Sequence, residues 1–285
     1  SLTYQPTAYA TPVYTLRGVG FYDSSLASYP TVSVYIDEAP QPLPVLTTHS
    51  AYDLERVEVL KGPQGTLFGN NSTGGAVNFI AAKPTDAFEA GGDLTYGRFS
   101  RVEGNAYISG PLSGNLKGRI AINGAISDDW QYATGQAAGN GATAYSAGRL
   151  LLDWQPTEAL RFQLNANGWV DDSDPQTPQY NALIPQFPAT VAPLLLTGPF
   201  TPKNARATDF SLAFRPRSHQ EMGQAALRAD LELTSDITVT SLTSYIEYNR
   251  DGAFDLDGST VADTAIPQIT GQITSFRQEL RTSNG

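Results

Sequence analysis

From residue 88 onward, apolar and polar side chains alternate in stretches of about ten residues. In LRFQLNANGWV, residues 160–170, Leu160, Phe162 and Leu164 fall on one face of an extended chain and polar side chains on the other. This period of two predicts β-strands with one apolar face, and about ten residues is enough to cross a bilayer as a tilted strand. About eight such strands are predicted, at residues 88–97, 102–110, 116–126, 144–154, 160–170, 225–233, 237–248 and 271–282.

The links between these strands alternate in length. Three links are tight (PLSGN, QPTEA and TSD), whereas those at 127–143, 171–221 and 249–270 are long. The link near 98–101 is short and breaks the rule. Tight turns on one rim and long loops on the other are typical of an outer-membrane β-barrel. A soluble β-sandwich also alternates, but it has no reason to sort its loops in this way.

Residues 1–84 have a different character. Short β-like pieces (TVSVYID, DLERVEVL and GGAVNFIAA) are joined by turns rich in glycine and proline, which predicts a small mixed α/β domain. The glycines near residues 62–75 do not form a phosphate loop, because no lysine follows them in the required place and no G-x-G-x-x-G occurs. They predict backbone positions with positive φ or close approach. The domains are therefore predicted as 1–84 and 85–285.

Composition excludes several classes of function. The net charge of −10 argues against nucleic-acid binding, and the absence of cysteine excludes disulfides and thiolate chemistry. No catalytic motif is present, and the two histidines lie far apart in loop-like sequence. The segment FDLDGSTVADT departs from a calcium loop at Ala253 and Thr264. We therefore expect no catalytic residue, no metal site, no cofactor and no enzyme.

Three segments carry a specific resemblance. TLRGVG (15–20), VSVYIDE (32–38) and DLERVEVLKGPQGTLFGNNSTGGAVNFIAAKP (53–84) resemble the plug domain of TonB-dependent outer-membrane receptors, and FRQELRTS (276–283) resembles a barrel strand of the same family. The resemblance implies a mixed α/β plug domain followed by antiparallel transmembrane β-barrel strands, as part of a barrel of about 22 strands. Nothing before Thr15 resembles the energy-coupling box of the family, so the chain is expected to be a fragment with an incomplete plug.

The resemblance also implies a function. Such a receptor binds a scarce nutrient in the outer membrane of a Gram-negative bacterium and imports it to the periplasm, with energy transmitted by the TonB complex of the inner membrane. Siderophore-bound iron is the commonest cargo, and saccharides or cobalamin use the same scaffold. Its other partners are outer-membrane lipid and lipopolysaccharide. A soluble β-rich carbohydrate-binding or carbohydrate-active protein is the alternative, which detergent dependence distinguishes.

The resemblance suggests ion pairs between plug and barrel. Arg17 and Arg56 match positions where family plugs carry arginines that pair with carboxylates on the inner barrel wall. Glu232 and Glu279 are predicted to face the lumen and are the candidate partners. Ordinary exposed charge is the alternative reading of all four residues.

The ligand is expected between the plug and the long loop at 171–221. The turns at 20–30 and 39–50 are candidates for the outer end of the plug. In the first of them, Tyr22 and Tyr29 offer stacking faces and Asp23 offers a hydrogen-bond acceptor. These three residues are the predicted ligand contacts.

Overall fold

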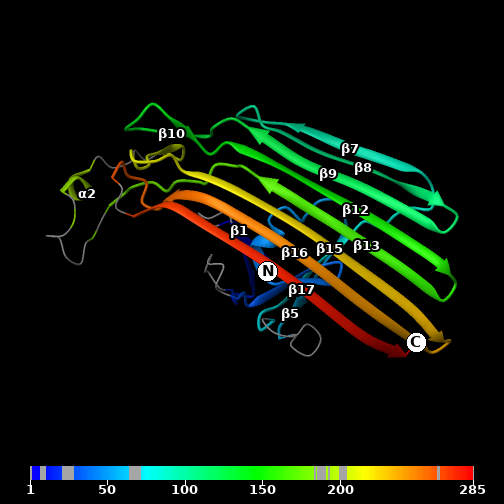
Figure 1. Cartoon of the computed structure of the whole chain (residues 1–285). Coiled ribbons are helices and arrows are strands. Elements are labelled where there is room, and N and C mark those ends of the chain that lie inside the picture. Colours follow the sequence, from blue (N-terminus) through cyan, green and yellow to red (C-terminus); the bar gives the residue numbers. More distant parts are fainter. Residues whose placement is uncertain are drawn as a thin grey trace.

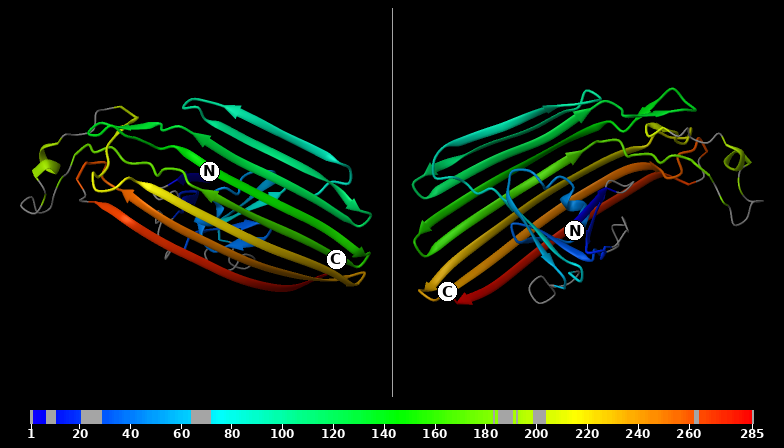
Figure 2. Two further views of the ribbon diagram at one scale, coloured as in Figure 1. Left: turned by 45° about the horizontal axis from the view of Figure 1, so that its top comes forward. Right: turned by 180° about the vertical axis from the view of Figure 1, so that it is seen from behind.

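A curved sheet of long strands dominates the computed structural model, and a smaller group of strands lies against one face of it (Figure 1; Figure 2). The structure describes residues 2–6, 11–20, 29–63, 72–182, 184, 191, 193–198, 204–261 and 264–284. We call the large sheet the wall and the smaller group the plug. Within the described residues, no helix has the length and apolar character needed to span a bilayer.

The wall is an eight-stranded antiparallel sheet in which each strand pairs with its neighbour along the wall. Its strands are β7 (Glu89–Tyr96), β8 (Val102–Ser113), β9 (Leu116–Ser127), β12 (Thr143–Thr157), β13 (Leu160–Asp171), β15 (Arg217–Thr234), β16 (Ile237–Asp255) and β17 (Ala265–Asn284). The predicted antiparallel strands are confirmed. The last three are longer than predicted. In β15, RSHQE precedes the first apolar side chain, so the outer end of this strand is polar on both faces and leaves no alternation to read.

Side chains alternate across the wall as the sequence predicts. In β12 and β13, odd-numbered positions such as Arg149, Leu151 and Trp169 are buried beneath the plug. Ile120 and Ile122 of β9 point away from the plug and are 51% and 57% exposed. An outward face of exposed aliphatic side chains suits contact with lipid rather than water.

The two ends of the wall differ. Residues 113–116, 157–160 and 234–237 form tight turns at one end. The long links lie at the other end, where they contain β10 (Gln131–Ala133), β11 (Gly139–Asn140), β14 (Ala207–Thr208) and the short helix α2 (Pro193–Thr197) (Figure 1). This is the sorting of links expected from the sequence.

The plug is built on a four-stranded sheet in the order β4-β3-β6-β5. Its strands are β3 (Val32–Ile36), β4 (Ala39–Gln41), β5 (Leu54–Lys61) and β6 (Gly75–Ala81), with β3 and β6 parallel. The hairpin of β1 (Leu2–Pro6) and β2 (Pro12–Leu16) and the 3-10 helix η1 (Pro44–Thr47) complete its described part. The plug has its own apolar core, made by Tyr14, Leu16, Val32, Val34, Val77 and Phe79.

Two glycines of the stretch that follows β5 have the backbone role expected of them. Gly62 has a φ of 92° and Gly75 a φ of 137°. A Cβ at Gly75 would lie 2.2 Å from the carbonyl oxygen of Leu60, so no other residue fits there. The last plug strand ends at Ala81 and the first wall strand begins at Glu89. The division between residues 84 and 85 stays a prediction.

Candidate functional site

The contact between plug and wall is the candidate functional site, and an apolar cluster lies at its centre. The plug contributes Leu43, Val45, Leu46 and Tyr52 from η1 and its flanking loops. The wall contributes Ala121, Ala147, Trp169, Met222, Ile246 and Tyr248, which come from neighbouring inward-facing positions. The predicted outer turn at 39–50 is therefore packed on the wall through much of its length. Burial of these side chains holds this part of the plug in place.

A buried ion pair borders the cluster. Arg119 of β9 faces Asp53, which precedes β5, and its Nε donates to Oδ2 at 2.8 Å while a second nitrogen donates to Oδ1. The two side chains are only 7% and 11% exposed. The Arg119 guanidinium also lies 4.0 Å from the ring centre of Tyr107. A paired, two-point contact of this kind fixes both distance and orientation between plug and wall.

Arg149 holds the same plug loop through its backbone. This buried side chain of β12 donates to the carbonyl oxygens of Tyr52 at 2.9 Å and Ser50 at 3.2 Å. Its guanidinium stacks 4.5 Å from the ring centre of Tyr52. Burial raises the pKa of Tyr52 to about 12, and its hydroxyl has no hydrogen-bond partner among the described residues. Arg149 thus binds backbone carbonyl groups of the plug and not a carboxylate.

His49 makes a third contact near the end of the wall that carries the long links. Its Nε2 donates to Oδ2 of Asp171 at 2.7 Å, and both side chains are largely buried. The imidazole stacks on Tyr145 with ring centres 4.0 Å apart and meets the edge of Trp169 at 5.3 Å. The sequence analysis set this histidine aside as a loop residue, because its partners come from distant strands.

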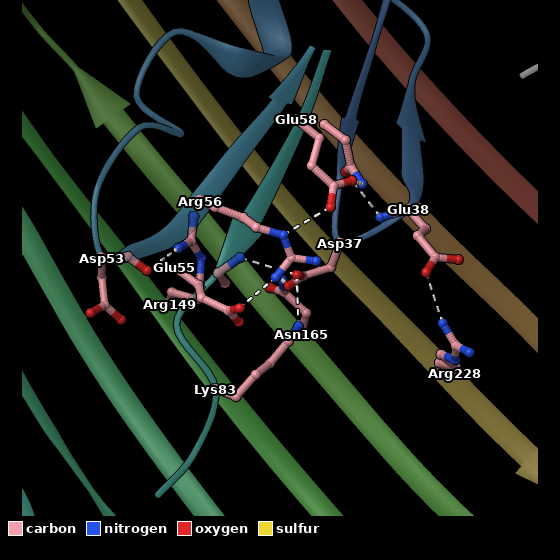
Figure 3. Close-up of polar contacts among 12 residues, drawn as sticks. Asp37, Glu38, Asp53, Glu55, Arg56, Glu58, Lys83, Arg149, Asn165 and Arg228 are labelled. Carbon is pink, nitrogen blue, oxygen red and sulfur yellow. Dashed lines mark hydrogen bonds and ion pairs between the residues drawn. The ribbon is translucent and has the colours of Figure 1, made fainter. Parts of the chain in front are cut away.

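The turn between β3 and β4 makes a more exposed contact, shown in Figure 3. Asp37 and Glu38 both have positive φ, 46° and 67°, in a two-residue hairpin turn. Asp37 accepts from Asn165 of β13 at 2.6 Å and from the plug residue Lys83 at 2.8 Å. Glu38 accepts from Arg228 of β15 at 3.0 Å.

Glu38 has a second wall partner, Arg281 of β17. Both guanidiniums also lie beside a carboxylate of the wall itself, Arg228 beside Asp230 at 2.8 Å and Arg281 beside Glu279 at 3.7 Å. The side chains of Glu38, Arg228 and Arg281 are 31–42% exposed. Exposed pairs of this kind contribute only about 0–1 kcal/mol each.

A cavity of about 170 Å³ lies beside this turn, between plug and wall. Asp37, Glu38, Arg56 and Lys83 line it from the plug side, and Arg228 is among its wall residues. The lining mixes these charged side chains with apolar ones, among them Leu151, Leu164 and Leu242.

The four residues predicted to pair across the interface are not brought together. Between described residues, no ion pair joins Arg17 or Arg56 to Glu232 or Glu279. Arg56 instead contacts its own neighbours on β5, Glu55 and Glu58, the latter at 2.8 Å. Arg17 is exposed. Pairing of these four residues in the way predicted stays a prediction.

The arginine–carboxylate pairs that do form across the interface have the opposite polarity, with Asp53 and Glu38 on the plug and Arg119, Arg228 and Arg281 on the wall. The sequence held a signal for the wall side, because its alternation places Arg119, Arg149 and Arg228 on inward-facing positions. It held none for the plug partners, Asp37, Glu38 and Asp53, whose direction depends on turn geometry.

Of the predicted ligand contacts, Tyr22 and Asp23 lie outside the described residues. Tyr29 is 68% exposed, as a residue that meets an external ligand would be. Its role in ligand binding stays a prediction.

Comparison with known proteins agrees with this architecture. Residues 4–76 match the family model described as the TonB-dependent receptor plug domain. These residues form a TonB-dependent receptor plug domain. It is 33% identical over 120 residues to the pesticin receptor of Yersinia pestis, an alignment covering 40% of this chain and 16% of that protein. Over 76 residues it is 42% identical to the ferripyoverdine receptor of Pseudomonas aeruginosa, which covers 26% of this chain and 9% of that protein.

Solved TonB-dependent receptors share the fold. The crystal structure of the ferric yersiniabactin uptake receptor FyuA from Yersinia pestis superimposes with a TM-score of 0.74 at 20% identity. That superposition covers 99% of this chain and 41% of FyuA. The ferripyoverdine receptor from Pseudomonas aeruginosa gives 0.72 at 16% identity, covering 99% of this chain and 36% of that receptor. The chain thus spans well under half the length of these relatives.

These similarities indicate the cellular location of the chain. It is part of an outer-membrane protein of a Gram-negative bacterium, with a plug and an antiparallel wall as the sequence predicted. The relatives are transport receptors, not enzymes.

Proposed function

We propose that the receptor containing this chain binds an iron-siderophore complex at its outer face and imports it to the periplasm. The energy is transmitted by the TonB complex of the inner membrane. The observation that carries this proposal is the plug itself, a domain with its own core that is packed against the inner face of the wall. A wall closed by a plug admits a bulky molecule only if the plug moves, which requires an energy source.

The cargo class rests on the relatives. Among them are receptors named for ferripyoverdine, ferric enterobactin and ferrioxamine B. All three names denote an iron chelate, so an iron-siderophore complex is the cargo best supported for this chain. The same proposal makes the protein a transporter that catalyses no reaction and needs no resident cofactor.

The nature of the plug–wall contact supports repeated opening. The polar contacts between plug and wall are hydrogen bonds and ion pairs, and water molecules can take their place when the two surfaces separate. The outward face of the wall, with Ile120, Ile122 and Leu227 exposed, is proposed to contact outer-membrane lipid and lipopolysaccharide. Tyr22, Asp23 and Tyr29 are proposed to contact the ligand from the plug.

Deletion of the gene tests the function. A deletion strain, grown under iron limitation, is supplied in turn with catecholate, hydroxamate and mixed-type ferric siderophores. We expect it to lose growth and radioactive iron uptake on one class only, and to regain both with the full-length gene. Purified receptor should bind the same chelate and not its iron-free form. Uptake of every chelate at the wild-type rate would refute the proposal.

The ligand contacts have their own test. Tyr29→Ala, combined with Tyr22→Ala, should weaken binding of that chelate about tenfold, roughly 1.4 kcal/mol. Tyr96→Ala is the matched control, because Tyr96 is a similarly exposed tyrosine of β7 on the outward face of the wall. Equal affinity in the double variant and the control would remove the tyrosines from the site.

A further inference from the structure

A row of glycines crosses the outward face of the wall. Gly148 of β12 lies opposite Gly168 of β13, which lies opposite Gly223 of β15. These three strands are neighbours in the wall (Figure 1). The residues that precede or follow the glycines face the plug in the apolar cluster, so the glycine positions face away from it; these neighbours are Ala147, Trp169 and Met222. Three adjacent strands therefore present no side chain to the bilayer at the same level.

The backbone does not explain this row. None of the three glycines has a positive φ, and their strands pair without a bulge on either side of them. A Cβ at Gly223 would have no atom within 4 Å, and one at Gly148 would meet the Ala121 carbonyl oxygen at 4.0 Å. Only Gly168 is crowded, because its Cβ would lie 2.7 Å from the Met222 carbonyl oxygen. Glycine weakens a strand and often marks a bulge, a bend or the close approach of another molecule. With no bulge and open space at two of the three positions, close approach is the remaining explanation.

The missing side chains leave a groove of about 500 Å³ on the outward face. This volume falls within the range of small-molecule sites, about 300–1,000 Å³. Its lining includes the three glycines together with Ser146, Val170, Glu221, Glu247 and Asn249. Strands β9 and β17 flank the four strands that form the groove, so it does not include an edge of the wall.

The groove lies where the outward face changes from apolar to polar. The next outward positions towards the tight turns are Leu150, Ala166, Ala225 and Tyr245. The next outward positions towards the long links are Ser146, Val170, Glu221 and Asn249. In outer-membrane barrels the long loops are extracellular, and aromatic side chains mark the two membrane interfaces. The groove is therefore at the level where the acyl chains of the outer leaflet meet their head groups.

The polar border of the groove offers hydrogen-bond acceptors. Glu221 and Glu247 are exposed and have no ion-pair partner among the described residues, although Asn249 donates to Glu221 at 3.1 Å. The basic side chains further out on β15, Arg217 and His219, are paired with other carboxylates. Carboxylates without a cation accept hydrogen bonds from hydroxyl and amide groups and repel phosphate. The border thus suits a head group rich in donors.

We propose that this groove binds one molecule of lipopolysaccharide, with an acyl chain lying across the glycines and sugar groups donating to Glu221 and Glu247. The sugar backbone of this lipid carries hydroxyl and amide donors between its phosphates, so the donors can face the carboxylates. A phospholipid places its phosphate directly above its chains, next to the two carboxylates. This inference rests on the proposed function, because it names the place where the outward face holds lipopolysaccharide.

Filling the groove tests the site. Gly223→Leu puts a side chain into the open space, and Gly104→Leu is the matched control on the outward face of β8, where a Cβ lies no closer than 3.4 Å to another side chain. A second variant, Glu221→Ala with Glu247→Ala, removes the acceptors and leaves the groove open. Each full-length receptor is freed of lipid in detergent. Native mass spectrometry then measures its binding of purified lipopolysaccharide, of the same lipopolysaccharide without its acyl chains, and of phosphatidylethanolamine.

We expect wild type and Gly104→Leu to retain one intact lipopolysaccharide, and Gly223→Leu and the double alanine variant to bind it about tenfold more weakly. Neither the deacylated form nor phosphatidylethanolamine should bind wild type as tightly. Equal binding of phosphatidylethanolamine, or unchanged binding of lipopolysaccharide by Gly223→Leu and the double variant, would overturn the proposal. Binding of the ferric chelate, measured on the same preparations, should be equal in all of them. Its absence from wild type would count against the proposed import function and not against the lipid site.

Discussion

Removing the Arg119 side-chain charge is expected to loosen the plug severely. The variant Arg119→Met keeps much of the aliphatic stem but leaves the Asp53 carboxylate, 11% exposed, without its partner. Two opposite charges about 4 Å apart attract by about 4 kcal/mol at an effective dielectric constant of about 20. Loss of one partner from a buried pair costs about 3–5 kcal/mol, because the remaining charge stays desolvated. The lost contact with the Tyr107 ring adds about 0.5–2 kcal/mol.

Arg228→Met is the control, because it removes the same chemical group from an exposed pair. Its expected cost is about 0–1 kcal/mol. The double variant Asp53→Asn with Arg119→Met should recover a large part of the loss, since no bare carboxylate remains. Calorimetry of the full-length receptor in detergent measures the unfolding of the plug. Entry of a large antibiotic into intact cells measures its looseness.

The order of the variants decides the reasoning. We expect Arg119→Met to lower the plug transition most and to admit the antibiotic, with the double variant between it and wild type and Arg228→Met near wild type. Equal effects of Arg119→Met and Arg228→Met would refute the claim that burial sets the strength of these links. A double variant worse than Arg119→Met would show that the two residues stabilise the plug independently.

Three further predictions concern plug residues that are packed against the wall. Tyr52→Phe should leave the free energy of unfolding unchanged or raise it by about 1 kcal/mol, because it removes a buried hydroxyl without a partner among the described residues. Tyr14→Phe should lower it by about 0.5–1.5 kcal/mol, because the Tyr14 hydroxyl is hydrogen-bonded to Thr47 at 2.7 Å. Calorimetry compares the two variants. Burial raises the pKa of Tyr52 from 10.0 to about 12. The free energy of unfolding is therefore unaffected by this hydroxyl below pH 10 and falls as the pH rises from 10 towards 12, because ionisation favours the unfolded chain. The plug transition measured across this window should fall less steeply in Tyr52→Phe. His49→Phe keeps an aromatic ring on Tyr145 but removes the hydrogen bond to Asp171. The same calorimetry should show that the free energy of unfolding falls by about 1–3 kcal/mol. An unchanged free energy would mean that stacking alone holds this loop.

The wall was predictable because its physics is local. Each strand must present apolar side chains to one side only, so β9, β12 and β13 carry their pattern in their own residues. The pattern fails in the first residues of β15, where both faces are polar. For this reason the sequence alone placed the start of that strand too late, at residue 225 instead of residue 217.

The interface was only half predictable. Inward-facing arginines are visible in the alternation, but their partners depend on two-residue turns and on contacts between distant segments. The resemblance to the family directed attention to Arg17 and Arg56 on the plug. In the structure Arg56 lies among its own strand neighbours Glu55 and Glu58, and the plug presents carboxylates to the wall instead.

The long range of these links has a consequence for assembly of the protein. The plug is synthesised before the wall. Asp53 precedes Arg119 by 66 residues, and Glu38 precedes Arg228 by 190 residues and Arg281 by 243. The plug core of β2, β3 and β6 involves no wall residue, so the plug can become compact first. Contacts of such large sequence separation form slowly. Docking is therefore expected to be a late event, completed only when β15 and β17 have taken their places in the sheet.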